Sequence, residues 1–229
     1  MRLAALALLL LAAAPLSAQG VSDARYLEPT DRYGHGILGD AIEWGALEME
    51  TGGGPVLIRL PDTHVFEDTW PRLADLDGDG DAEVIVVETA MAEGARLSVY
   101  DETGLVAATP HIGRTHRWLS PIGAADLDGD GLIEIAYVDR PHLAKTVRIW
   151  RFEDGGLTEV AAASGVTNHR IGEEDIAGGI RDCGSGPEMI VATADWTRLL
   201  ALTFDGQEIA ARDIGPHRDR SSFADAMAC

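Results

Sequence analysis

Basic residues are scarce in this chain. Its 229 residues include 18 Lys plus Arg against 38 Asp plus Glu, which gives a formal net charge of −20 at pH 7. A surface of this sign repels the phosphate backbone of DNA and RNA. We therefore expect no nucleic-acid partner, and the informative question is how the acidic residues are clustered.

Long apolar runs are absent beyond the N-terminus. Residues 1–18 contain Arg2, an apolar run from Leu3 to Ala14 and small residues ahead of Gln19, a pattern typical of a cleaved secretory signal. A membrane anchor is the alternative, but the run is shorter than the ~20 residues that span a bilayer. The sequence thus predicts a signal peptide at residues 1–18, export to the periplasm or the medium, no stable membrane insertion, and one mature domain at residues 19–229.

Cysteine is nearly absent. The two cysteines are Cys183 and Cys229, the last residue. Because disulfides persist in oxidising compartments, export predicts that these two residues form a disulfide, which would hold a tail that would otherwise fray. Two free thiols are the alternative.

Sustained helical periodicity is also missing after the signal, and the chain has 26 glycines, which argues against a helical array. Three segments instead repeat a pattern of strand, Asp/Gly turn and strand, which is the strongest short-range signal of a β-hairpin. These segments are residues 96–106, 147–160 and 198–209, with a weaker copy at 56–66. Further strands are predicted ahead of the hairpins, at residues 41–48, 82–88, 133–139 and 187–193.

The spacing of the repeats predicts the architecture. Glu83, Glu134 and Glu188 hold equivalent places 51 and 54 residues apart, so one unit has about fifty residues and about four short strands. This period is typical of a β-propeller blade. We expect an all-β, β-propeller-like fold of about four blades of four antiparallel strands, at approximately residues 26–68, 69–113, 114–167 and 168–229. A β-sandwich is the alternative, but it requires no such repeated order of strands.

Acidic residues cluster in two loops of one pattern. The loops read Asp75-Leu-Asp77-Gly-Asp79-Gly-Asp81-Ala-Glu83 and Asp126-Leu-Asp128-Gly-Asp130-Gly-Leu132-Ile-Glu134. Alternating carboxylates can turn their oxygens inward around a hard cation, and glycine permits the sharp bend. Calcium suits such a loop because it accepts six to eight oxygens in flexible geometry, whereas magnesium demands a tighter octahedron. The sequence predicts two calcium sites; a metal-free acidic turn is the alternative.

The two loops do not match the EF-hand. That motif requires a bidentate Glu at its twelfth position, between two helices. The twelfth residue is Val86 in the first loop and Tyr137 in the second. The acidic residue comes at position nine, directly before a strand-forming run, so each loop is expected to join two strands.

These loops resemble those of the FG-GAP or VCBS repeats, which occur in integrin alpha-subunit propellers and in many bacterial exported proteins. The family loop follows Asp-x-Asp-x-Asp-Gly-x-x-Asp and runs into an apolar strand. The resemblance implies one ligand set of Asp75, Asp77, Asp79, Glu83 and the carbonyl of Asp81, and a second of Asp126, Asp128, Asp130, Glu134 and the carbonyl of Leu132. Position nine is Glu here, where the family usually has Asp.

The other two units lack competent loops. Residues 180–188 keep Glu188 but have lost nearly all of the preceding carboxylates, and Cys183 lies inside this segment. We expect no calcium there, and we hypothesise that the disulfide to Cys229 replaces the metal as the fastener of the last unit. The first unit has only Gly39-Asp40-Ala41 at this place.

Motifs of catalysis are absent from the sequence: there is no nucleophile elbow, phosphate-binding glycine loop or dinucleotide fingerprint. None of the seven histidines has a recognisable metal or triad spacing, and a zinc site shared by His111 and His116 is a minor alternative to ordinary hydrogen bonding. Trp70 and Trp118 are expected to be more exposed than Trp44 and Trp150.

The sequence therefore predicts a non-enzymatic exported module with structural calcium, which binds an unidentified protein or glycan partner or serves as a scaffold. A carbohydrate-binding lectin or a carbohydrate-active enzyme on the same scaffold is the alternative, because two carboxylates are enough for glycan cleavage.

Overall fold

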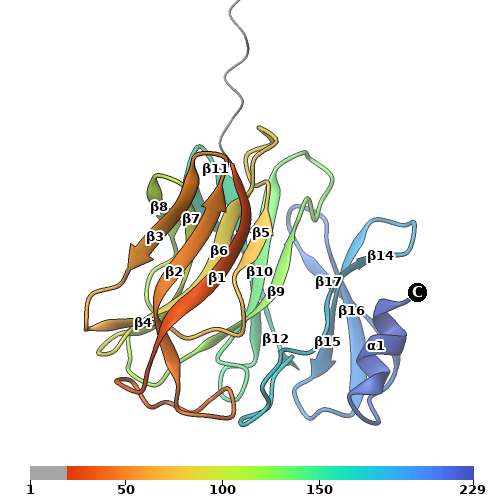
Figure 1. Cartoon of the computed structure of the whole chain (residues 1–229). Helices are drawn as coiled ribbons and strands as arrows, with labels where there is room; N and C mark the ends of the chain where they lie inside the picture. Colours follow the sequence, from red (N-terminus) through yellow and green to blue (C-terminus); the bar gives the residue numbers. More distant parts are fainter. Residues whose placement is uncertain (1–19) are drawn as a thin grey trace, which may run out of the picture.

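A computed structural model of the chain describes residues 20–229 (Figure 1). The predicted signal peptide at residues 1–18 lies outside these residues. Seventeen β-strands and one short helix make up the regular structure of the described part, and every strand pair in it is antiparallel. The prediction of an all-β fold is confirmed.

The first sheet has eight strands. Six of them follow the order β1-β2-β4-β6-β7-β8, while β3 pairs with β2 and β5 pairs with β6. The strands are β1 (Val21–Thr30), β2 (Glu43–Thr51), β3 (Gly54–Arg59), β4 (His64–Phe66), β5 (Arg72–Ala74), β6 (Glu83–Ala90), β7 (Gly94–Asp101) and β8 (Gly104–Ala108).

The third sheet repeats the connectivity of β4 to β8, and the four-stranded second sheet repeats that of β5 to β8. The second has the order β12-β11-β10-β9, and in the third β13 and β14 both pair with β15, which is followed by β16 and β17. Their strands are β9 (Leu119–Ala125), β10 (Ile133–Asp139), β11 (Thr146–Glu153), β12 (Gly156–Ser164), β13 (Val166–Thr167), β14 (Gly179–Asp182), β15 (Pro187–Thr193), β16 (Arg198–Phe204) and β17 (Ile209–Pro216). The bounds of β10 and β15 are those predicted from the sequence.

The sheets differ in one respect from the four expected units. Residues of the first two units share the eight-stranded sheet, because Phe66 of β4 pairs with Trp44 of β2 and also with Glu88 of β6. The short strand β4 therefore links two groups of strands that the repeat pattern separates. No sequence signal marks this link, since β4 has only three residues.

The sheets pack face to face in chain order, and in Figure 1 the second sheet lies between the first and the third. One apolar cluster joins the first two sheets and includes Leu97, Leu119 and Ile135. Another joins the second and third sheets and includes Ile149 and Met189. Burying each such side chain stabilises the folded protein by roughly 1.5–3 kcal/mol, so these two clusters hold the three sheets together.

Strand β6 shows how the sequence encodes this layering. All eight of its residues are buried. Ile85 and Val87 belong to the cluster shared with the second sheet, whereas Val84 and Val86 belong to a separate cluster with β1 and β2. Because successive side chains of a strand point to opposite faces, a strand covered on both faces reads as a continuous apolar run.

The C-terminus is fastened to the third sheet. Helix α1 (Ser221–Met227) packs Phe223, which is 3% exposed, against the cluster that contains Ile190 of β15. Cys229 then forms a disulfide with Cys183, with a sulfur-sulfur distance of 2.03 Å, so the predicted pairing is confirmed. No helix within residues 20–229 combines the length and apolar character needed to cross a membrane.

Candidate metal centre

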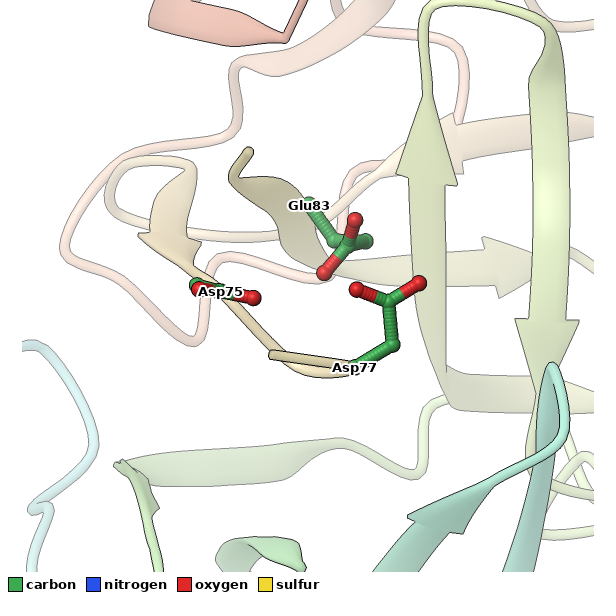
Figure 2. A group of neighbouring side chains, drawn as sticks. All are labelled: Asp75, Asp77 and Glu83. Atoms are coloured by element: carbon green, nitrogen blue, oxygen red, sulfur yellow. The ribbon is translucent and has the colours of Figure 1, made fainter. Parts of the chain in front are cut away.

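The first acidic loop connects β5 to β6. The carboxylates of Asp75, Asp77 and Glu83 point toward one another across this loop (Figure 2). Asp75 accepts backbone hydrogen bonds from Gly78 at 2.7 Å and from Gly80 at 3.1 Å. Both glycines have positive φ, a conformation that costs glycine nothing, so the backbone can wrap around the Asp75 carboxylate.

The second acidic loop connects β9 to β10 and repeats this geometry. Asp126 accepts backbone hydrogen bonds from Gly129 at 2.7 Å and from Gly131 at 3.0 Å. These two glycines also have positive φ. The carboxylates of Asp126, Asp128 and Glu134 gather as those of the first loop do. Two loops 51 residues apart in the sequence thus have one structure.

The spacing of the gathered oxygens fits a single hard cation. In each loop, one oxygen from each of the three carboxylates lies within 4.8 Å of the other two. Oxygens that share a calcium ion lie 2.3–2.6 Å from it, so they are at most about 5 Å apart. Each of the two acidic clusters can therefore hold a metal ion, and both have the oxygen-only donor set that calcium and magnesium prefer.

The remaining predicted ligands lie outside these two groups. Asp79 accepts a hydrogen bond from the backbone of Asp81, and Asp130 accepts one from the backbone of Leu132. These bonds hold the turn that precedes β6 and β10. The side chains of Asp79 and Asp130 therefore stabilise the loop backbone through one oxygen each.

The ninth-position glutamates are the most enclosed members of the two groups. Glu83 is 8% exposed and accepts a hydrogen bond from the backbone of Leu76, and Glu134 is fully buried and accepts one from the backbone of Leu127. Burial raises the pKa of both carboxyl groups above the usual range. A divalent cation beside them would offset the cost of burying a negative charge at these positions.

An arginine makes the two loops electrostatically different. Arg151 of β11 lies opposite Glu134 in the sheet and forms salt bridges with Glu134 at 2.6 Å, Asp128 at 2.5 Å and Asp130 at 3.0 Å. In the first loop, Tyr100 pairs with Val84, so the residue opposite Glu83 is the acidic Asp101. No salt bridge within residues 20–229 involves a first-loop carboxylate. The second loop is thus partly neutralised by the chain itself.

The third loop, between β14 and β15, has the equivalent place in its sheet but different chemistry. Asp182 accepts backbone hydrogen bonds from Gly184 and Gly186, two and four residues on, whereas Asp75 and Asp126 accept theirs from glycines three and five residues on. Glu188, however, forms salt bridges with Arg181 and Arg212. Two guanidinium groups and the disulfide of Cys183 occupy the place that the acidic cluster has in the other loops.

Comparison with known proteins agrees with this geometry. A family description of an FG-GAP-like repeat matches residues 75–137, a stretch that begins at the first ligand of the first loop and ends within β10. Over residues 75–137 the chain is similar to an FG-GAP-like repeat. The match confirms the resemblance drawn from the two acidic loops. No curated protein and no solved structure gives a significant match to the chain.

Some side chains near the FG-GAP-like repeat were misplaced or missed by sequence reasoning. Trp70 is 48% exposed as expected, but Trp118 is only 2% exposed, because its indole N–H donates to the Glu67 carbonyl and its ring packs on His169. No group of three potential metal ligands within residues 20–229 includes a histidine. The salt bridges of Arg151 with the second loop were not predicted, although the hairpin register of residues 133–153 would have placed this residue opposite Glu134.

We expect Arg151 to weaken metal binding at the second loop of the FG-GAP-like repeat. The variant Arg151→Gln removes a positive charge beside the proposed ion, so the calcium dissociation constant of this loop should fall about tenfold, which corresponds to 1.4 kcal/mol. Isothermal titration would measure the change. Arg198→Gln is the matched control, because Arg198 pairs with Asp213 on an exposed surface. Equal affinity in both variants would contradict the prediction.

Proposed function

We propose that this chain is an exported binding or scaffold module with propeller-like blades, in which calcium stabilises the two acidic loops. The observation that carries the proposal is the pair of acidic clusters of one pattern, each with three carboxylate oxygens within 4.8 Å of one another, in a stretch that matches an FG-GAP-like repeat. Their oxygen-only chemistry and flexible loop backbone favour calcium over zinc or copper.

The proposed role of calcium is structural. Each acidic loop joins the first strand of a unit to its buried second strand, β6 or β10, and Glu83 and Glu134 begin the buried segments. Without a counter-ion, four or five carboxylates in nine residues repel one another at this junction. A bound ion would convert this repulsion into attraction and fix the loop between its strands.

Export is proposed from residues 1–18 and is supported by the disulfide, since disulfides persist in oxidising compartments. The face-to-face packing of successive antiparallel sheets supports a propeller-like arrangement of the units. We propose that the module acts through its surface rather than by catalysis. N-terminal sequencing of the exported protein should place its start near Gln19.

Calcium removal tests the structural role. At a free calcium concentration ten times the dissociation constant, each site should add about 1.4 kcal/mol to the free energy of unfolding. Thermal unfolding with excess EDTA and with calcium should therefore give clearly different melting temperatures, and magnesium should replace calcium only in part.

Variants assign the effect to the loops. Asp77→Asn and Asp128→Asn should each remove about half of the calcium-dependent stabilisation, because each neutralises one member of a gathered group. Asp62→Asn is the control, because the Asp62 side chain is fully exposed and far from both groups in the sequence. A melting temperature that is the same with EDTA and with millimolar calcium would refute the proposal.

A further inference from the structure

A cavity of about 230 Å³ lies at the end of β10 opposite the second acidic loop. Glu134 stands near the start of this strand, and Arg140, which lines the cavity, follows its last residue. The six residue steps from Glu134 to Arg140 along extended chain span about 20 Å. The cavity is therefore distinct from the metal centre.

Four separate segments converge to build the cavity. They are the connection between β1 and β2, the residues ahead of β9, the residues after β10 and the connection between β13 and β14. Backbone hydrogen bonds tie these segments together: Gly172 donates to the carbonyl of Ile37 at 3.1 Å, and Arg140 donates to the carbonyl of Trp118 at 3.0 Å. The walls are thus fixed without a ligand, as in most small-molecule sites.

The charge of the lining is opposite to that of the protein. Among the described residues, the cavity is lined by arginine, histidine and apolar side chains and by no carboxylate, although the chain has 38 Asp plus Glu. The charged and imidazole groups are Arg117, Arg140, His35, His116 and His142. Because the chain is so acidic, its surface repels anions, and a cavity with this lining repels them less.

Most of these groups already have partners. Arg140 forms a two-point salt bridge with Asp139, at 2.8 and 2.9 Å. His35 bonds through Nδ1 to the buried carboxylate of Glu67, which compensates any charge on that ring. The His142 and His169 rings contact each other at 3.2 Å, and burial lowers the pKa of both, so they are neutral at pH 7.

The two other groups are His116, whose ring stacks on that of His35 at a centroid distance of 4.9 Å, and Arg117. The Arg117 guanidinium donates to the carbonyl of His116 at 2.6 Å, and no salt bridge within residues 20–229 includes it. An arginine without an acidic partner, half-buried at the wall of a cavity, is suited to bind a carboxylate from solution through two parallel hydrogen bonds.

The backbone at the rim is held in an unfavourable conformation. His116 and Arg140 both have positive φ, at 53° and 45°; this conformation is uncommon for arginine, although histidine adopts it more often than most residues do. The hydrogen bond from the His116 backbone to the Tyr33 hydroxyl, at 2.7 Å, helps to hold this geometry. Such conformations cluster at ligand sites, where they aim side chains that a relaxed backbone would turn away.

Apolar side chains complete the cavity and select for an organic ligand. Ile37 and Trp118 form buried wall, whereas Leu143 and Ile171 at the mouth are 64% and 68% exposed. Two large apolar side chains thus face solvent at the mouth of the cavity. Inorganic phosphate would leave them in water, but an apolar body attached to a carboxylate would cover them.

We propose that this cavity binds a small organic carboxylate, with its acid group on Arg117 and its apolar body between Trp118, Leu143 and Ile171. The ligand is smaller than a drug-sized molecule, because the cavity lies below the usual range of such sites. The proposed site gives the module a ligand of a defined chemical class. The metal centre alone does not indicate what the module binds.

The test uses the full exported chain, saturated with calcium, and three probes in titration calorimetry: benzoate, the neutral isostere benzamide, and inorganic phosphate. Benzoate should bind at least tenfold more tightly than either of the other two. Equal binding of benzoate and benzamide, equal binding of benzoate and phosphate, or no binding of benzoate would each overturn the proposal.

Two pairs of variants assign the binding to the cavity. Arg117→Gln should weaken benzoate binding about tenfold, whereas Arg114→Gln, an exposed neighbour that does not line the cavity, should leave it unchanged. Leu143→Asn should weaken binding modestly by removing an apolar contact, and Leu143→Asp should weaken it several-fold more, because the new carboxylate also repels the ligand. Leu143 is exposed, so neither change should impair folding. Loss of binding in Arg114→Gln but not in Arg117→Gln, or equal effects of both Leu143 variants, would refute the assignment.

Discussion

Breaking the disulfide between Cys183 and Cys229 is expected to lower the free energy of unfolding by up to about 4 kcal/mol. The bond closes a loop with a sequence separation of 46 residues, and the chain-entropy account gives this magnitude for a loop of that size. The closed loop contains β15, β16, β17 and α1. Denaturant unfolding of Cys183→Ser, Cys229→Ser and the double variant would measure the loss.

The two single variants and the double variant should lose the same stability, because each of them breaks the same bond. The native protein in excess reductant is the control, and it should match the double variant. A loss below 1 kcal/mol would mean that the contacts of Phe223 with the third sheet hold the C-terminus without the bond.

The same bond tests whether a disulfide replaces a metal in the third sheet. Hydrogen exchange should show that reductant exposes β15, which follows the loop of Cys183, while EDTA leaves it protected. EDTA should instead expose β6 and β10, which follow the two acidic loops. If EDTA and reductant affected all three strands alike, the disulfide and the metal ions would not each stabilise only their own unit.

The parts of the fold that the sequence predicted are those in which a local pattern is repeated. Asp/Gly turns fix hairpins within a few residues, so β10 and β15 could be placed to the residue. The acidic loops were predictable for the same reason, since their glycines and carboxylates determine the loop backbone within nine residues. The link made by β4 could not be predicted, because it consists of a single residue pair, Phe66 with Trp44, and this pair depends on how distant strands pack.

The cavity was invisible in the sequence because its residues come from four connections between strands. Arg117 and Leu143 carry no motif, and His35 is brought to them only by the packing of the sheets. Arg151 is an intermediate case, because the hairpin register places it beside Glu134 but neither residue alone signals the contact. Local chemistry is thus readable from this sequence, whereas contacts across sheets are not.

Replacing Glu43 by glutamine is expected to stabilise the protein, by about 3 kcal/mol at pH 7. Glu43 is the first residue of β2 and is 2% exposed. Burial, together with the negative charges of Glu67, Asp40 and Asp68, raises its pKa from 4.5 to about 9. Within residues 20–229 no basic side chain forms a salt bridge with Glu43, whereas Glu67 and Asp68 pair with His35 and Arg72.

The sign of the effect follows from proton binding. Between about pH 4.5 and pH 9 the folded protein holds a proton on Glu43 that the unfolded chain releases. The stability of the native protein therefore falls as the pH rises through this window, at about 1.4 kcal/mol per pH unit. Glutamine keeps the shape of the protonated acid and has no proton to release, so the advantage of Glu43→Gln should vanish near pH 4.5 and grow up to about pH 9.

Denaturant unfolding of both proteins at pH 5, 7 and 8.5 would measure this difference. Glu50→Gln is the matched control, because Glu50 lies in the same strand with a side chain that is 43% exposed, and its replacement should change the stability by less than about 0.5 kcal/mol at every pH. If the Glu43→Gln advantage were independent of pH, the carboxyl would be ionised equally in the folded and unfolded chains. Glu67 and Asp68 already have His35 and Arg72 as partners, so a bound cation beside Glu43 would then have to balance its charge.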